Sequence, residues 1–127
     1  MADRALFVGW GEPVRGREER ALEVFNDWVG MLGRKQSSGE IEGMDATLLD
    51  PHGGELGGFF QIYGSEAQCA ALQNDEEFRR AVTDATLIVE KFGVVPAVTG
   101  EGVSREMGIY AEAIAKVGDG AHALSST

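Results

Sequence analysis

The chain has 127 residues, of which 43% are hydrophobic and 25% charged, a composition that fits one globular domain and excludes a disordered or fibrous protein. Its formal net charge of −10 repels phosphate backbones and anionic lipid headgroups, so neither nucleic acid nor a membrane is an expected partner. No apolar run approaches the roughly 18 residues that span a bilayer, and the N-terminus lacks a signal-peptide pattern. With a single cysteine, the simplest expectation is a reduced, cytoplasmic protein.

The first predicted elements are a strand and a long helix. Residues 5–10 form a short apolar run that ends at Gly11 and Pro13, which is typical of a strand. Residues 16–34 carry apolar side chains over about half of a helical circumference. This helix is therefore expected to pack on a large apolar surface.

The next two predicted strands, residues 41–49 and 56–63, are expected to form a hairpin. The connecting sequence Asp-Pro-His-Gly-Gly at 50–54 consists of residues that favour turns. The loop between the two strands is several residues long, which still allows antiparallel pairing.

A second helical region is predicted after the hairpin. Ser65 and Gln68 have the spacing of a capping box, and a second box at 74–77 restarts the helix. Apolar residues then repeat at helical spacing as far as Phe92, and Gly93 is expected to be the C-cap.

The last predicted elements are a strand and a helix. Residues 94–99 are expected to form a strand at a sheet edge or with a bulge, because Pro96 has no N–H to donate to a ladder. Ser104 is the expected cap of a further helix that ends near Val117. We therefore divide the chain into a domain at 4–100, a C-terminal helix at 101–117 and a loose tail at 118–127.

The order strand, helix, hairpin, helix, strand predicts an α+β fold of the ferredoxin-like βαββαβ type, with a four-stranded antiparallel sheet. Such a sheet carries its helices on one face, yet both faces of the strands are apolar here: Leu6 opposes Phe7 in the first strand, and Phe60 opposes Phe59 in the third. An uncovered apolar face of this size favours a partner sheet. The sequence thus predicts a homodimer through the open sheet face.

Four local signatures accompany this order: Leu-Phe-Val-Gly-Trp-Gly in the first strand, Leu-Asp-Pro-His-Gly-Gly in the hairpin, Asn-Asp-Glu-Glu-Phe at the helix restart and Gly-Val-Val-Pro-Ala-Val in the last strand. With them, residues 5–100 resemble the dimeric α+β barrel superfamily, and within it a YCII-related or similar uncharacterised domain. The resemblance implies a ligand pocket between the sheet and the two helices of each subunit. YCII-type proteins carry a His/Asp pair near the pocket, which has no counterpart here because no histidine precedes His52.

The superfamily includes cofactor-free monooxygenases, haem-degrading enzymes, cyclases, isomerases and ligand-sensing domains, so the fold does not select a function. His52 and Asp45 are the candidate catalytic bases. His52 lies in a Pro-His-Gly-Gly turn, where we expect an exposed side chain without a partner and a structural role. The chain has no set of ligands at metal-binding spacing, so neither a metal nor another cofactor is expected.

The candidate ligand-binding residues are aromatic or flexible apolar side chains with one amide among them. They are Trp10, Trp28, Met31, Met44, Phe59, Gln61 and Tyr63. Gln61 shares a strand face with Phe59 and Tyr63, so the amide lies in an aromatic row. The alternative is that the whole set belongs to the core and the dimer interface. Cys69 is expected to be a small buried core residue.

Three functions remain open from the sequence. The first is a small homodimer that binds an apolar or aromatic small molecule. The second is a cofactor-independent monooxygenase, cyclase or isomerase that uses His52 or Asp45 as its base. The third is a structural module whose C-terminal helix docks on a neighbour.

Overall fold

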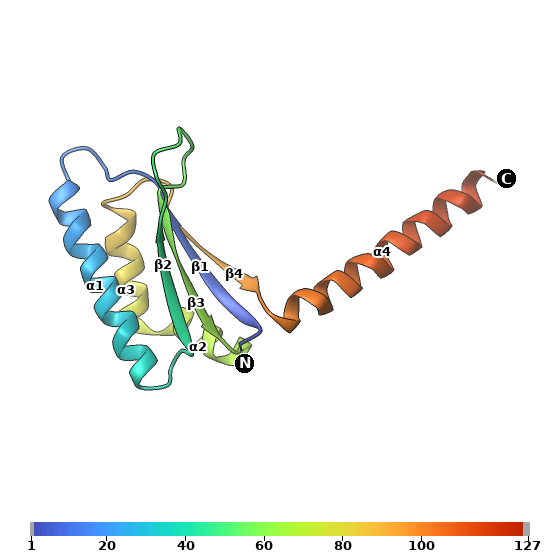
Figure 1. The fold of residues 1–127 in the computed structure, drawn as a ribbon, viewed down its shortest axis with the longest axis horizontal. Coiled ribbons are helices and arrows are strands. Elements are labelled where there is room, and N and C mark those ends of the chain that lie inside the picture. Colours follow the sequence, from blue (N-terminus) through green and yellow to red (C-terminus); the bar gives the residue numbers. More distant parts are fainter. Residues whose placement is uncertain (1, 126–127) are drawn as a thin grey trace.

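A computed structural model describes the backbone of residues 2–125 and the side chains of residues 2–118. It contains a four-stranded antiparallel sheet in the order β2-β3-β1-β4. The strands are β1 (Arg4–Trp10), β2 (Gly43–Leu48), β3 (Gly58–Gly64) and β4 (Gly93–Val98). Helices α1 (Glu18–Ser37), α2 (Glu66–Asn74) and α3 (Glu76–Thr86) belong to the sheet domain, and α4 (Glu101–Ser125) projects away from it (Figure 1). This is the predicted ferredoxin-like α+β fold.

The sheet centres on β1, which pairs with β3 on one side and β4 on the other. Leu6 lies opposite Ile62 of β3 and Pro96 of β4. Because β4 is an edge strand, no strand lies on its outer side, and the missing N–H of Pro96 costs no hydrogen bond there. Of the two predicted alternatives, an edge strand and a bulge, the structure has the edge strand.

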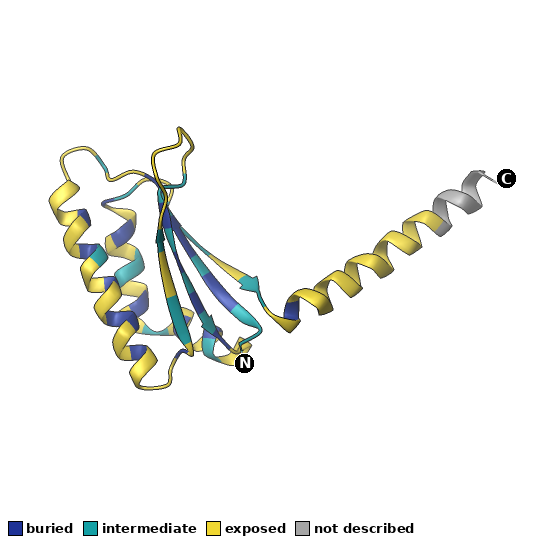
Figure 2. Cartoon of the chain, viewed as in Figure 1, coloured by how far each residue is buried: buried dark blue, intermediate teal, exposed yellow. Residues whose placement is uncertain are grey.

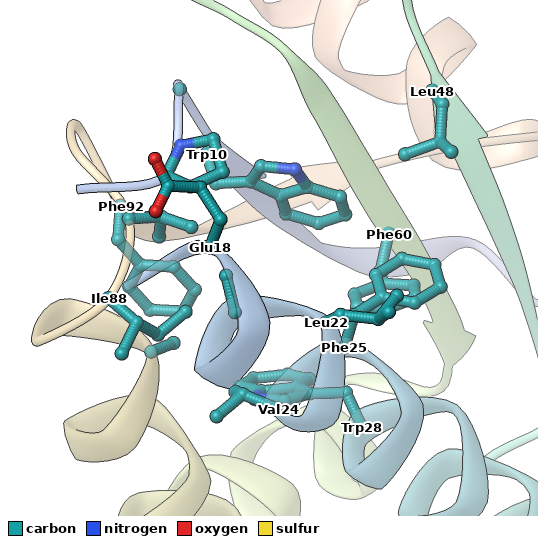
Figure 3. Close-up of a pocket in the computed structure, with 15 residues that line it drawn as sticks. Trp10, Glu18, Leu22, Val24, Phe25, Trp28, Leu48, Phe60, Ile88 and Phe92 are labelled. Atoms are coloured by element: carbon teal, nitrogen blue, oxygen red, sulfur yellow. The ribbon is translucent and has the colours of Figure 1, made fainter. Parts of the chain in front are cut away.

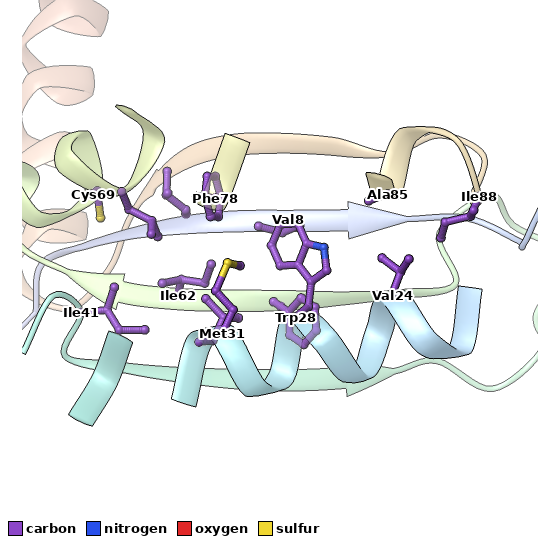
Figure 4. Close-up of a cluster of buried hydrophobic side chains, with 14 of the residues drawn as sticks. Val8, Val24, Trp28, Met31, Ile41, Ile62, Cys69, Phe78, Ala85 and Ile88 are labelled. Atoms are coloured by element: carbon purple, nitrogen blue, oxygen red, sulfur yellow. The ribbon is translucent and has the colours of Figure 1, made fainter. Parts of the chain in front are cut away.

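The core lies between the sheet and the α1–α3 layer (Figure 4). Leu6, Val8, Leu32 and Ile62 are its most deeply buried side chains. They come from β1, α1 and β3, so burial of one face of the sheet joins three elements that are distant in the sequence.

Helix α1 starts later and ends later than predicted. Gly16 has a φ of 91°, which is outside the helical region, so the helix begins at Glu18 instead of residue 16. Its first turn is acidic and its last turn contains Arg34 and Lys35, an arrangement that complements the helix dipole and extends the helix to Ser37.

The two short helices are separated by a cap. The predicted capping box at the start of α2 is present, with Gln68 N–H donating to Ser65 Oγ at 3.1 Å. The second cap is displaced by one residue from its predicted position. Asp75, not Asn74, accepts the N–H of Phe78, at 2.9 Å, and so starts α3.

The prediction that the helix continues to Phe92 is wrong, because α3 ends at Thr86. The chain that follows pairs with the segment after β1: the N–H of Val14 donates to the carbonyl of Ile88 at 2.8 Å. Pro13 and Val89 form an isolated bridge in the same place. Backbone pairing to a distant segment therefore replaces helical bonds, and Gly93, predicted as a C-cap, begins β4.

Helix α4 is longer than predicted on both sides. It begins at Glu101 and continues through Ser125, where a loose tail was expected from residue 118. Gly118 and Gly120 each cost about 1 kcal/mol in a helix, but the good helix formers that follow them keep the backbone helical. Of the predicted tail, residues 126–127 lie outside the described part of the chain.

The sheet presents apolar side chains on both faces, as predicted. Phe60 and Ile62 are buried against the helices, whereas Phe59 and Tyr63 point to the open face and are half-buried. On that open face the rings of Phe7 and Phe59 lie 5.0 Å apart between centroids.

Candidate functional site

A cavity of about 370 Å³ lies between the sheet and the helical layer (Figure 3). It is bounded by the first half of α1, by the end of β1 and by the segment that follows α3. Its aromatic walls are formed by Trp10, Phe25, Trp28, Phe60 and Phe92. This is the position in which the superfamily resemblance implied a pocket.

The aromatic side chains of the cavity form one connected cluster around Phe60. Its ring centroid lies 5.0 Å from that of Trp10, 5.4 Å from that of Phe25 and 5.7 Å from that of Trp28. The rings of Phe60 and Phe25 are stacked, as are those of Phe60 and Trp28. Such mutual contacts hold the walls in place, so the site is preorganised for a flat apolar molecule.

Little hydrogen-bonding capacity is left for a ligand. The indole N–H of Trp28 donates to the carbonyl of Ala81 at 3.2 Å and so ties α1 to α3. Among the residues that the structure describes, Glu18 is the only ionisable side chain that lines the cavity, and its Oε1 already accepts the N–H of Gly16 at 2.9 Å. The cavity therefore favours molecules with few polar groups.

Backbone pairing closes one end of the cavity. The N–H of Gly11 donates to the carbonyl of Glu90 at 2.7 Å, and the N–H of Glu90 donates to the carbonyl of Glu12 at 2.9 Å. These bonds join the segment after β1 to the segment after α3. The end of α3, which the periodicity did not predict, is thus the feature that shapes this wall.

The predicted ligand-binding residues do not form one site. Trp10 and Trp28 line the cavity, while Met31 is buried and Met44 half-buried in the core outside it. The other three predicted residues, Phe59, Gln61 and Tyr63, lie on the open face of the sheet. Alternate residues of a strand point to opposite faces, so these three cannot join Trp10 and Trp28.

Several lining residues were missed by the sequence analysis. Phe25 could have been predicted as a lining residue, because it precedes Trp28 by three positions on the same apolar face of α1. Phe60 was assigned to the correct strand face but not to the site. Ile88 and Phe92 were assigned to a helix, so no signal in the sequence placed them at the cavity wall.

His52 has partners, contrary to the expectation of a free side chain. The N–H of Gly54 donates to Nδ1 at 3.1 Å, so Nδ1 must accept. Nε2 then carries the proton and donates to the carbonyl of Leu56 at 2.8 Å. The imidazole holds the loop between β2 and β3 together and is not among the residues that line the cavity.

Asp45 also lies outside the cavity. It is on β2, and its Oδ2 accepts a hydrogen bond from the hydroxyl of Tyr63 at 2.9 Å. That hydrogen bond, with burial and the charge of Asp45, raises the pKa of Tyr63. The pair is a polar feature of the open sheet face.

Cys69 is buried, as predicted. Burial is the main cause that raises the pKa of its thiol, so the thiolate is disfavoured and the side chain is not set up as a nucleophile. Among the residues that the structure describes, no three histidine, cysteine, aspartate or glutamate side chains gather as metal ligands would. Within the same part of the chain, none of the helices combines the length and the apolar character of a membrane span.

No protein-family model matches the chain, and no curated protein does either. Solved structures do match. A dimeric protein of unknown function with a ferredoxin-like fold, from Bacteroides fragilis, superposes with a TM-score of 0.56 and 11% identity over 76% of this chain and 96% of its own. A candidate antibiotic biosynthesis monooxygenase from Chloroflexus aurantiacus superposes with a TM-score of 0.51 and 8% identity, over 76% and 93%. At these identities the likeness shows the fold, and the relation to YCII-type domains stays a prediction.

Proposed function

We propose that this protein binds an apolar small molecule with one or two rings in the cavity between α1, the segment after α3 and the sheet. The observation that carries the proposal is the aromatic lining, because five rings surround about 370 Å³ of space. Small-molecule sites typically have volumes of roughly 300–1,000 Å³ and mostly apolar walls. The identity of the ligand is restricted to uncharged or weakly polar molecules by the scarcity of free hydrogen-bonding groups.

Binding can be measured from the protein's own fluorescence, since its two tryptophans, Trp10 and Trp28, both line the cavity. Titration with 1-naphthol, an uncharged two-ring probe, is expected to change this emission. Ala21→Phe places a ring in the cavity and should weaken binding about tenfold, whereas Ala70→Phe on the exposed side of α2 should leave it unchanged. Equal affinities of the two folded variants would show that the cavity is not the site.

We infer further that two copies pair through the open sheet face. The support is the apolar character of that face, where Phe7 and Phe59 are half-buried and Val95 is 55% exposed. The fold neighbour from Bacteroides fragilis is itself described as dimeric. Face-to-face packing would remove these side chains from water.

The dimer is tested with two matched substitutions. Val95 on the open face is 55% exposed, and Leu87, which follows α3, is 58% exposed. Val95→Lys is expected to lower the sedimentation coefficient, because the sheet contact is lost, while Leu87→Lys keeps the value of the parent protein. A monomeric parent protein, or equal behaviour of both variants, would contradict pairing through the sheet.

The enzymatic alternative keeps some support, because a fold neighbour is a candidate antibiotic biosynthesis monooxygenase. In a cofactor-independent reaction in this cavity, Glu18 would be the base, since it is the only ionisable lining residue. Turnover of bound 1-naphthol, followed by mass spectrometry, should then be lost in Glu18→Gln and kept in Glu19→Gln. Binding without turnover would leave the protein as a binding module.

A further inference from the structure

Helix α4 contacts the domain through Gly102 and Arg105, near its start. Arg105 forms an ion pair with Asp3 at 3.1 Å. Gly102 packs closely on the same residue, because a Cβ there would lie 2.6 Å from the carbonyl oxygen of Asp3. The N–H of Thr99 donates to that carbonyl at 3.0 Å. These contacts fix the direction in which the helix leaves the domain.

From residue 103 to residue 118, every described side chain of α4 is exposed (Figure 2). Six large apolar side chains share this exposure, with 44% to 72% of their surface accessible. Five of them, Val103, Met107, Tyr110, Ile114 and Val117, lie on one side of the helix and are here called the α4 stripe, whereas Ile109 lies outside it. From Met107 onward, each member of the stripe keeps more than half of its surface accessible.

The α4 stripe has the spacing of a helix-packing seam. Its members follow one another by four, three, four and three positions, so at 100° per residue they lie on a strip about 80° wide. Alternating spacings of three and four residues allow side chains to interlock with those of another helix. The charged residues Glu101, Arg105, Glu112 and Lys116 are on the opposite side.

The helix also needs a partner for its own stability. It contains four glycines, at 102, 108, 118 and 120, and each lowers helix stability by about 1 kcal/mol. Isolated helices of such composition are marginal in water unless an apolar face is packed. A Cβ at Gly108 or Gly118 would meet no atom within 4 Å, so the small size of these residues serves no contact within the described part of the chain.

A second copy of α4 fits the stripe by shape. Tyr110 is the midpoint of the stripe, so antiparallel pairing about this residue places Val103 opposite Val117 of the second copy. The positions that flank the seam include Ala111, Ala113 and Gly118, which allow close approach.

A second copy of α4 also fits the stripe by charge. With a net charge of −10, two copies repel each other except where a face is neutral. Glu106 is the only charged residue that borders the stripe, and antiparallel pairing keeps the two copies of Glu106 about 12 Å apart along the axis. Within residues 101–118, the opposite side carries two acidic and two basic residues, without the basic excess that holds an amphipathic helix on an anionic membrane.

We propose that the α4 stripe is a self-association surface, on which α4 of one copy packs antiparallel against α4 of a second copy with Tyr110 at the centre. Antiparallel packing aligns the helix dipoles favourably and keeps the two domains at opposite ends of the pair. Identical stripes make an isologous contact. This contact is separate from the open sheet face and from the ligand cavity.

Cysteine cross-linking tests the pairing directly. Tyr110→Cys places a thiol at the centre of the stripe, and Glu112→Cys places one on the opposite side of the same helix, while Cys69 stays buried in both. Under mild oxidation, Tyr110→Cys should give a covalent dimer on a denaturing gel and Glu112→Cys should not. Val103→Cys should also stay monomeric, since antiparallel pairing puts its thiol opposite Val117.

The remaining outcomes are equally decisive. No cross-link in Tyr110→Cys, or equal cross-linking of Glu112→Cys, would overturn the proposal, and efficient self-linking of Val103→Cys would overturn the antiparallel arrangement. The Tyr110→Cys cross-link should persist when Val95→Lys disables the open sheet face, so failure of either interface is seen separately. As a second measurement, Ile114→Lys should lower the helix content by circular dichroism, and Glu112→Lys should not.

Discussion

The ammonium of Lys35 lies 3.0 Å from Oδ2 of Asp75 and so joins the end of α1 to the junction of α2 and α3. Its side chain is 5% exposed, and carboxylate oxygens of Glu40 and Glu77 lie 3.4 Å and 3.7 Å away. Burial alone would lower the pKa of Lys35, but the hydrogen bond and charge of Asp75, together with Glu40, outweigh it and raise that pKa. The lysine is thus held charged inside the fold.

Removal of Asp75 should therefore destabilise the protein through two separable effects. Asp75→Ala leaves a buried cation with weaker partners and also removes the cap of α3, so we expect a loss of about 3 kcal/mol in the free energy of unfolding. Asp75→Asn keeps a capping oxygen and should lose about 1 kcal/mol less. Urea denaturation of both variants measures the difference, and an alanine variant no worse than the asparagine variant would contradict the capping role.

The protein should lose stability in acid. Hydrogen bonding to the N–H of Phe78, then to Lys35, holds the pKa of Asp75 below its ordinary 3.8, and the hydrogen bond from Arg34 holds the pKa of Glu77 below 4.5. Since the unfolded state binds these protons more readily, the stabilisation is present above about pH 4.5 and is lost as pH falls through the folded-state values. Glu77 is nearly half exposed and contributes less.

This acid dependence can be measured by urea denaturation at a series of pH values from about 6 to about 3. The slope of unfolding free energy against pH should be shallower in Asp75→Asn than in the parent protein, because this substitution removes one carboxyl group with a lowered pKa. Unchanged slopes would show that other groups dominate the acid response.

Tyr63 should ionise at higher pH than an ordinary tyrosine. Its hydrogen bond to Asp45, then burial and the charge of that carboxylate, raise its pKa above 10.0. The chain has one other tyrosine, so Tyr110→Phe leaves Tyr63 as the sole phenol in an absorbance titration. Asp45→Asn in this background should lower the pKa of Tyr63 toward its ordinary value.

The raised pKa of Tyr63 also determines how the stability of the protein changes at alkaline pH. The folded state holds the phenol proton more tightly than the unfolded state, so the stabilisation is full below about pH 10 and is lost as pH rises through the folded-state value. Unfolding measured on either side of this range should show the loss in the parent and less of it in Asp45→Asn. If Asp45→Asn left the pKa of Tyr63 unchanged, the hydrogen bond between these two residues would be contradicted.

Two glycine substitutions should have opposite effects on stability. A Cβ at Gly11 would lie 2.8 Å from the carbonyl oxygen of Glu55 and 3.0 Å from that of Glu90, both backbone atoms, so Gly11→Ala should destabilise by about 1–3 kcal/mol. A Cβ at Gly33, inside α1, would meet nothing within 4 Å, so Gly33→Ala should stabilise by up to about 1 kcal/mol. Thermal unfolding of the two variants tests both predictions: the midpoint should fall in Gly11→Ala and rise in Gly33→Ala. A fall in Gly11→Ala would also show that the backbone around Gly11, at one end of the cavity, does not move to accept a methyl group.

The sequence predicted well those features that depend on a residue and its near neighbours in the chain. Ser65 and Gln68 form the capping box that their spacing indicates. Pro96 lies in an edge strand, as a residue without an N–H must when it occurs in a regular ladder. The spacing of the α4 stripe was also present in the sequence, but the exposure of the stripe was not.

Elements that depend on a distant segment were predicted less well. Ile88 and Val89 have helical spacing, yet they leave α3 because their backbone pairs with Pro13 and Val14, some 75 residues earlier. His52 was expected to be free in its turn and instead bonds the backbone of its own loop, which depends on how that loop closes. Spacing within one segment contains no information about such partners.

The sequence by itself determined the order of the elements, the ferredoxin-like sheet and the apolar character of both sheet faces, because periods of two and of about 3.6 residues are local properties of the chain. Only the tertiary structure decided which aromatic side chains share a cavity. Trp10, Phe25 and Phe92 come from β1, α1 and the segment before β4, and they meet because these elements pack together. Tertiary structure likewise placed Phe59, Gln61 and Tyr63 on the other side of the sheet, since a site is made by packing across segments and not by composition.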